Sequence, residues 1–109
     1  MCKEFTMVRG DTFAFDLELP ELDPSTITSI HFTVKKNIKD EDYILQKSIG
    51  DGITKKSDRV YFVRVAPEDT KNIEPGMYAC DIQIGVNDDI YTPLIGSLRV
   101  VRDVTTRWE

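Results

Sequence analysis

The sequence is poor in the residue types that most often build a reactive centre. Its 109 residues include one histidine, two cysteines and one tryptophan. A Ser-His-Asp or Cys-His centre needs its histidine beside a nucleophile, whereas His31 lies on the polar side of an alternating segment. A structural zinc site needs four nitrogen or sulfur ligands at close spacing, which one histidine and two distant cysteines do not supply. We therefore expect no enzyme activity and no metal or other cofactor.

Long apolar runs and clusters of positive charge are also missing. No segment approaches the roughly 20 apolar residues of a membrane-spanning helix. Residues 1–10 lack the basic and then apolar order of a signal peptide. The formal net charge is −5, whereas nucleic acid and anionic membranes attract clustered Lys and Arg. We expect neither nucleic acid nor a membrane as a partner, and synthesis in the cytoplasm.

Three short motifs are better explained as turns than as binding sites. Asp40-Glu41-Asp42 and Asn87-Asp88-Asp89 lack the ligand spacing of a calcium loop, and runs of this composition are typical of solvated turns. Arg9-Gly10-Asp11 spells an integrin-recognition tripeptide but lies between two predicted strands. We interpret Gly10 and Asp11 as structural turn residues.

The length and composition are those of one soluble globular domain. Apolar residues make up 40% of the chain and charged residues 30%, which is ordinary for such a domain. We expect one domain over residues 1–109, with a core at about 5–102 and a C-terminal tail at 103–109.

Apolar residues recur at every second position through most of the chain, which is typical of half-buried strands. The predicted strands cover residues 5–8, 12–19, 29–36, 43–49, 60–65, 77–86 and 91–101. The inward register of 43–49 is ambiguous, and Pro93 marks a strand start or a bulge. One helical turn fits residues 67–73. Seven or eight short strands with regular turns predict an all-β fold, an antiparallel β-sandwich.

The two cysteines, Cys2 and Cys80, are far apart in the sequence. A bridge between them would close a long loop and contribute about 4 kcal/mol in the chain-entropy model. Nothing else in the sequence indicates an oxidising compartment. We favour two free thiols, with Cys80 as a small core residue, and leave the pairing open.

The aromatic residues offer two candidate contact regions. Tyr61 and Tyr91 are candidates for stacking on sugars, although single aromatic residues in strands are more often cross-strand partners. Trp108 lies near the end of the chain, and tryptophan is enriched at interface hot spots. Trp108 either caps the sandwich or, together with Val104 and Arg107, anchors the tail in a neighbouring subunit.

One stretch of the sequence resembles the tyrosine corner of immunoglobulin-type sandwiches. Asp69 and Thr70 precede Gly76 and the sequence Tyr78-Ala79-Cys80. In a tyrosine corner the tyrosine hydroxyl bonds back to the backbone at the entry to its strand. The resemblance implies structural roles for Asp69, Gly76 and Tyr78 in an immunoglobulin-like architecture. The chain lacks the partner cysteine and the core tryptophan of an antibody-type domain.

A longer resemblance covers roughly residues 8–105. Its motifs are Gly10-Asp11-Thr12, Ile30-His31-Phe32-Thr33-Val34-Lys35, Glu68-Asp69-Thr70, Pro75-Gly76-Met77-Tyr78-Ala79-Cys80-Asp81-Ile82, and Gly96-Ser97-Leu98-Arg99-Val100 followed by Asp103-Val104-Thr105. Together they are similar to the N-terminal domain of bacteriophage upper-baseplate and receptor-binding-adaptor proteins.

The phage resemblance implies a non-enzymatic structural protein of a phage or prophage tail or baseplate, located in the virion. Its partners would be other phage structural proteins and further copies of itself, as a homo-oligomer, joined through edge strands and the tail. The alternative is a carbohydrate- or cell-surface-binding β-sandwich module. That alternative predicts a row of exposed aromatic side chains or a calcium site.

Overall fold

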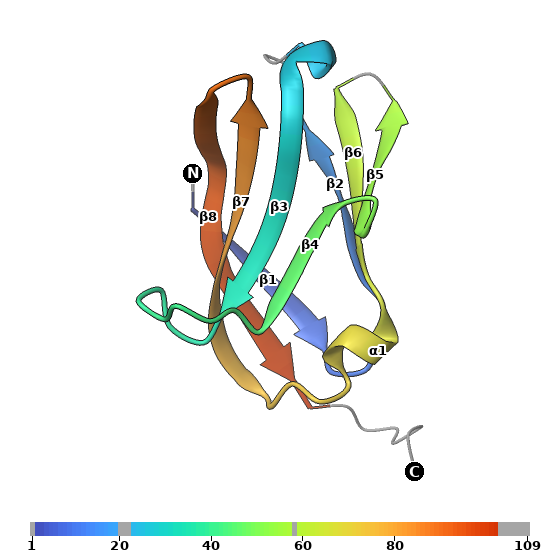
Figure 1. Ribbon diagram of the computed structural model, residues 1–109. Helices are drawn as coiled ribbons and strands as arrows, with labels where there is room; N and C mark the ends of the chain where they lie inside the picture. The colour runs from blue at the N-terminus through green and yellow to red at the C-terminus, as the bar shows by residue number, and fades with distance from the viewer. Residues whose placement is uncertain (1, 20–22, 58, 103–109) are drawn as a thin grey trace.

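The computed structural model describes residues 2–19, 23–57 and 59–102, with the backbone alone at residues 2, 3 and 24 (Figure 1). These residues form an all-β fold with one short 3-10 turn, η1, and one short helix, α1. The elements in chain order are β1 (Cys2–Val8), β2 (Phe13–Glu18), η1 (Pro24–Thr26), β3 (Ile27–Lys35), β4 (Leu45–Ile49), β5 (Gly52–Ser57), β6 (Val60–Val65), α1 (Pro67–Thr70), β7 (Gly76–Val86) and β8 (Asp89–Val101). The all-β prediction is confirmed.

The strands follow one another in the order β1-β8-β7-β3-β4-β5-β6-β2. Two residue pairs join β4 to β5, and at this point the sheet passes from one layer of the sandwich to the other. The layer β5-β6-β2 thereby packs against β8-β7-β3, so the molecule is an immunoglobulin-like β-sandwich (Figure 1).

Two strand pairs depart from the antiparallel arrangement that we predicted. β1 runs parallel to β8, and β4 runs parallel to β5. For β1 the reason is the connection that follows it. Gly10, with φ at +83°, lets the chain leave one layer and enter the other as β2, so β1 pairs with the last strand instead of with β2.

The inward row of each strand supplies the core. Phe15 of β2 and Phe32 of β3 join the two layers, with their ring centroids 5.4 Å apart. Cys80 is 4% exposed, which confirms it as a core residue. The apolar side chains without measurable exposure among the described residues are Ile30, Phe32, Val34, Ile53, Val63, Val65, Ile82, Ile84 and Leu98.

A tyrosine corner forms where the chain enters β7. The Tyr78 hydroxyl donates to the carbonyl oxygen of Glu74, and Lys36 Nζ lies 4.7 Å from the centroid of the Tyr78 ring. Gly76, with φ at +153°, is the first residue of β7. These contacts hold the turn before β7 against the sandwich.

Helix α1 closes the same end of the molecule. The Gly10 N–H donates to Thr70 Oγ1 at 2.9 Å, and the Asp11 N–H donates to the carbonyl of Val8 at 3.1 Å. Asp69 Oδ2 accepts the Ala66 N–H at 2.9 Å and caps the helix. Residues 9–11 are therefore a tight turn tied to α1, in line with the structural interpretation of Gly10 and Asp11.

The strand bounds differ from the predicted ones where the alternating pattern is weak. β5 escaped prediction because its residues from Thr54 to Ser57 are all exposed, so no apolar row marks the strand. Pro93 falls at a register shift of β8 against β7, which confirms a bulge.

In the part of the chain described above, no helix is long and apolar enough to cross a membrane.

Candidate interaction surface

The outward side of β8, β7 and β3 carries the most distinctive group of side chains. On β3 the even-numbered residues from Ile30 to Val34 are buried, so the odd-numbered residues point outward. We call the outward side of these three strands, together with Ile38 of the β3–β4 loop, the outer face. The outer face includes the side chains of Thr33, Lys35, Ile38, Met77, Ala79, Asp81 and Ile95.

Strand pairing aligns these side chains in rows across the sheet. Asp81 pairs with Ile95 on one side and with Thr33 on the other. Thr33 in turn pairs with Gln46, whose Nε2 donates to Thr33 Oγ1 at 3.1 Å. In the next row Ala79 lies between Ser97 and Lys35. Rows of this kind fix which side chains are neighbours on the outer face.

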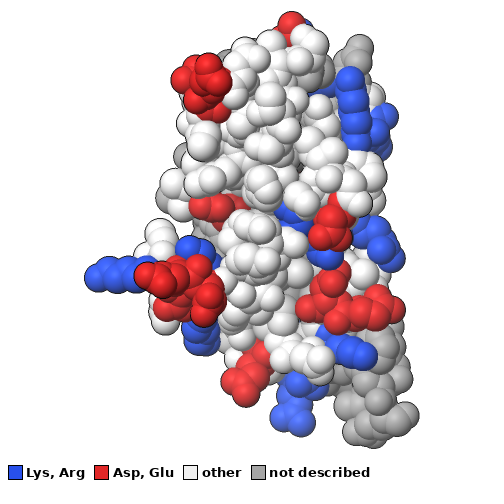
Figure 2. Space-filling model, viewed as in Figure 1, with Lys and Arg blue, Asp and Glu red and all other residues white. Residues whose placement is uncertain are grey.

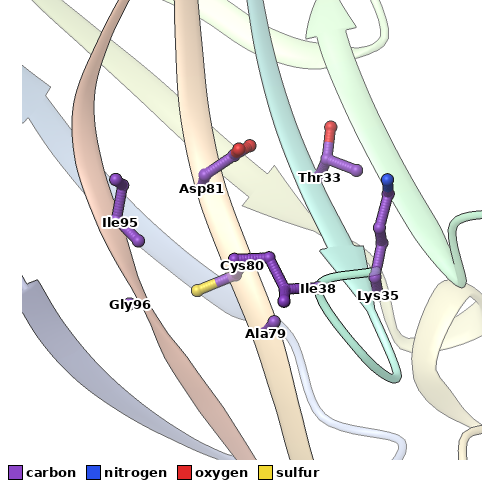
Figure 3. A pocket seen from close by; sticks show the side chains of 8 residues that line it. All are labelled: Thr33, Lys35, Ile38, Ala79, Cys80, Asp81, Ile95 and Gly96. Carbon is purple, nitrogen blue, oxygen red and sulfur yellow. The ribbon is translucent and has the colours of Figure 1, made fainter. Parts of the chain in front are cut away.

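A shallow hollow of about 120 Å³ opens in the outer face. Ala79, a small residue in the outward row of β7, leaves this space between larger neighbours. Figure 3 shows Asp81 of β7 and Lys35 of β3 among its lining residues, with Ile95 on the far side of β7 from Lys35. The full lining is Thr33, Lys35, Ile38, Ala79, Cys80, Asp81, Ile95 and Gly96.

Two opposite charges lie at this hollow. Burial raises the pKa of Asp81, and the positive charge of Lys35 partly offsets that rise. Lys35 Nζ also donates to the carbonyl of Asp40 at 2.8 Å, which ties the β3–β4 loop to β3. The hollow thus holds a partly desolvated carboxylate close to an ammonium group.

Large apolar side chains surround the hollow and are exposed. Ile38 is 73% exposed, Met77 is 49% exposed and Ile95 is 45% exposed. In the view of Figure 2 a mostly uncharged band runs down the middle of the molecule over β7 and β3, with charged side chains gathered mainly along its sides. Exposed apolar groups gathered on one face are a feature of protein contact surfaces.

A second charged cluster lies between β4 and α1, and it stabilises the fold. Lys47, which is 9% exposed, places its Nζ 2.8 Å from Asp69 Oδ2 and 3.8 Å from Asp51 Oδ1. Burial raises the pKa of Asp69, but hydrogen bonds from Lys47 and from the Ala66 N–H outweigh it and hold that pKa below its ordinary value. The Lys47 ammonium group and the Asp69 carboxylate are therefore each engaged by the other.

The structure places the residues that the sequence singled out as chemical candidates far from any shared centre. His31 pairs with Gln83 and with Ser48, and neither neighbour is an acid. Asp40 Oδ2 accepts the Asn37 N–H at 3.1 Å, as in a turn. Among the described residues, no three His, Cys, Asp or Glu side chains gather closely enough to hold a metal ion.

The structure describes the candidate aromatic residues of the strands but not the candidate contact residues of the C-terminal tail. Tyr61 is 5% exposed and so is not available for stacking on a sugar, whereas Tyr91 is 50% exposed. The register of β6 turns Tyr61 inward, in one row with Val63 and Val65. Cys80 is a free thiol, while the side chain of Cys2 lies outside the described part. Val104, Arg107 and Trp108 also lie outside the described residues.

Sequence reasoning missed the exposed apolar residues of the outer face. Ile95 lies in the outward row of the last strand beside the polar residues Ser97 and Arg99, and Ile38 is an apolar residue within the charged segment 36–42. Both are departures from the local pattern, and such departures were the available signal.

Comparison with known proteins adds little to this description. No family model matches the chain, and no curated protein matches its sequence significantly. Among solved structures, it is similar to part of a candidate glycoside hydrolase from Bacteroides vulgatus, with 14% identity, a TM-score of 0.47 and 91% of this chain covered. The chain spans 16% of the length of that protein.

A second similar structure is that of the extracellular domains of the voltage-gated sodium channel β4 subunit, solved as a parallel homodimer. It shares 12% identity at a TM-score of 0.46 and covers 94% of this chain and 93% of its own. Neither likeness bears on the function of this protein.

Proposed function

We propose that this protein is a non-enzymatic structural protein of a phage or prophage tail or baseplate that acts through protein–protein assembly. The observation that carries the proposal is the outer face, where exposed isoleucines, a hollow and one pair of opposite charges lie together. Contact surfaces of proteins combine an apolar centre with a few placed polar groups in this way.

The phage setting rests on the sequence resemblance across residues 8–105. The short motifs of that resemblance fall on the parts of the sandwich that fix its geometry. Gly10 and Asp11 form the turn into β2, Asp69 and Thr70 form the contacts of α1, and Tyr78 forms the corner before β7. The proposed location is accordingly the virion.

The sheet ends provide further places for contact with other structural proteins. β1 and β2 stand at the two ends of the strand order, and end strands are templates for pairing with another chain. The outward side of β2 carries Asp16, which forms an exposed ion pair of 2.9 Å with Lys56. Such an exposed charge limits unspecific pairing along that edge.

The experiment that tests the proposed function looks for the protein in particles. Phage or prophage particles from the producing strain are purified, analysed by mass spectrometry and labelled with gold-conjugated antibody against the purified protein. We expect the protein in stoichiometric amounts and gold at the tail or its base. Intact particles that lack the protein would overturn the proposal.

A further inference from the structure

We infer that the outer face is the contact between two copies of this chain, related by a two-fold axis. The inference rests on the proposed function and deepens it, because it names both the surface and the partner. A two-fold contact requires a surface that is complementary to itself. The outer face meets this requirement in charge, in arrangement and in shape.

The charges on this side of the sandwich suit the approach of a second copy. The outward charged side chains that the structure describes on β8, β7 and β3 are Lys35, Asp81 and Arg99, and Glu4 of the neighbouring strand β1 brings the total over these four strands to two of each sign. The whole chain has a net charge of −5. Two copies therefore repel each other over most of their surface, and this face offers an approach without net repulsion.

The positions of Asp81 and Lys35 also suit a two-fold contact. They lie on neighbouring strands, two residues out of register, since Asp81 pairs with Thr33 and Lys35 pairs with Ala79. A two-fold axis that lies in the contact plane and crosses both strands obliquely, through the midpoint between Asp81 and Lys35, brings Asp81 of each copy opposite Lys35 of the other. One operation thus forms two identical ion pairs.

The shape of the outer face also suits contact with a second copy. Ile38 and Ile95 protrude from the outer face, and the hollow of about 120 Å³ lies between them. Because the axis between Asp81 and Lys35 passes over this hollow, the hollows of the two copies face each other and the isoleucines at their rims pack around them. Asp81 is already partly buried, and Lys35 of the other copy supplies the opposite charge that offsets the cost of covering this carboxylate further.

The first test measures self-association of the purified full chain by sedimentation equilibrium. We expect a monomer–dimer equilibrium that is populated by roughly 100 µM, as in weak specific contacts. Ile95→Arg should weaken the dimer at least about tenfold, because it places a charge in the contact. The matched control is Ile49→Arg on β4, since Ile49 is 48% exposed and lies off the outer face; it should leave the dimer unchanged.

The second test exchanges the charges. Asp81→Lys alone and Lys35→Glu alone should each weaken self-association, because each sets like charges opposite one another across the axis. A mixture of the two variants should restore a dimer, as a heterodimer in which every pair is attractive. Circular dichroism of each variant verifies the fold.

Three outcomes would overturn the inference: a wild-type chain that stays monomeric, a dimer that Ile49→Arg disrupts and Ile95→Arg does not, or a charge-exchange mixture that stays monomeric. Each is independent of whether particles contain the protein. If the protein is a monomer in solution and is present in particles, this inference is wrong and the proposed function is supported. If the protein forms the dimer but is absent from particles, the proposed function is wrong and this inference is supported.

Discussion

Tyr78 shows at the scale of one residue how a single polar group holds a corner of the sandwich. Its hydroxyl donates to the Glu74 carbonyl, and the ring is 5% exposed. We expect Tyr78→Phe to lower the free energy of unfolding by about 1 kcal/mol, the usual contribution of one such hydrogen bond. Thermal denaturation should show a fall in Tm of roughly 4–8 °C. The control is Tyr91→Phe at a half-exposed site; an equal loss there would contradict the assignment.

The contact between Asp69 and Lys47 makes stability depend on pH. Since the folded-state pKa of Asp69 lies below its ordinary value of 3.8, the ionised carboxylate stabilises the fold above that pH. The contribution is lost as the pH falls through the folded-state pKa. Asp69→Asn should lower the free energy of unfolding by about 1–2 kcal/mol at pH 7. Urea denaturation at several pH values should show the difference from wild type shrinking below about pH 4.

The matched control for Asp69→Asn is Asp16→Asn, which removes an ion pair whose partners are 42% and 56% exposed. Water screens this pair, so its loss should change stability by at most about 0.5 kcal/mol. If the two variants behave alike, the Lys47–Asp69 contact does not stabilise the fold as we argue.

At the scale of elements, the turn between β4 and β5 depends on two glycines in different surroundings. Gly50 and Gly52 have φ values of +88° and +94°. A Cβ at Gly52 would lie 2.8 Å from the carbonyl oxygen of Arg64, whereas a Cβ at Gly50 would meet nothing within 4 Å. We expect Gly50→Ala to cost about 1 kcal/mol of backbone strain and Gly52→Ala clearly more, about 3 kcal/mol. Equal losses in chemical denaturation would refute the steric argument.

The elements also show how far the sequence alone could lead. Strict alternation predicted β7 and the buried row of Leu94, Leu98 and Val100 in β8, because one wet face and one dry face force that pattern. β5 could not be predicted in this way, since Thr54 to Ser57 are exposed on both sides. The parallel pairing of β1 with β8 also leaves no local signal, because it depends on two segments at opposite ends of the domain.

The outer face was harder to predict than the fold. Its residues come from three strands and a loop, and strand pairing alone makes Asp81, Thr33 and Ile95 neighbours. Ile38 and Ile95 are apolar at positions where the local pattern expects polar residues. A single sequence does not reveal whether such departures gather in one place, because that depends on register.

At the scale of the whole molecule, Cys80 reports on opening of the sandwich. Burial raises the pKa of its thiol to about 11, with a smaller contribution from the charge of Asp81. At pH 8 the native thiol is therefore both protonated and covered. We expect alkylation of Cys80 by iodoacetamide, followed by peptide mass spectrometry, to be at least about 1,000-fold slower in native protein than in denaturant.

The Cys80 measurement carries its own control. In the Tyr78→Phe variant, a loss of about 1 kcal/mol should speed alkylation of Cys80 roughly fivefold if opening is global. Rates in native and denatured protein within tenfold of one another would contradict a closed core.

The pairing of β1 with β8 has a consequence for synthesis of the chain. Cys2 aligns with Ile95 and Val8 with Val101, so β1 leaves the ribosome well before its partner strand β8 has been made. Each aligned pair is 93 residues apart in the sequence, so at roughly 5–20 residues per second the delay is about 5–19 s. During this interval β1 exposes an unsatisfied backbone to every neighbouring nascent chain. Crowded polysomes would therefore favour strand exchange between siblings, and slower initiation should improve the yield of correctly closed protein.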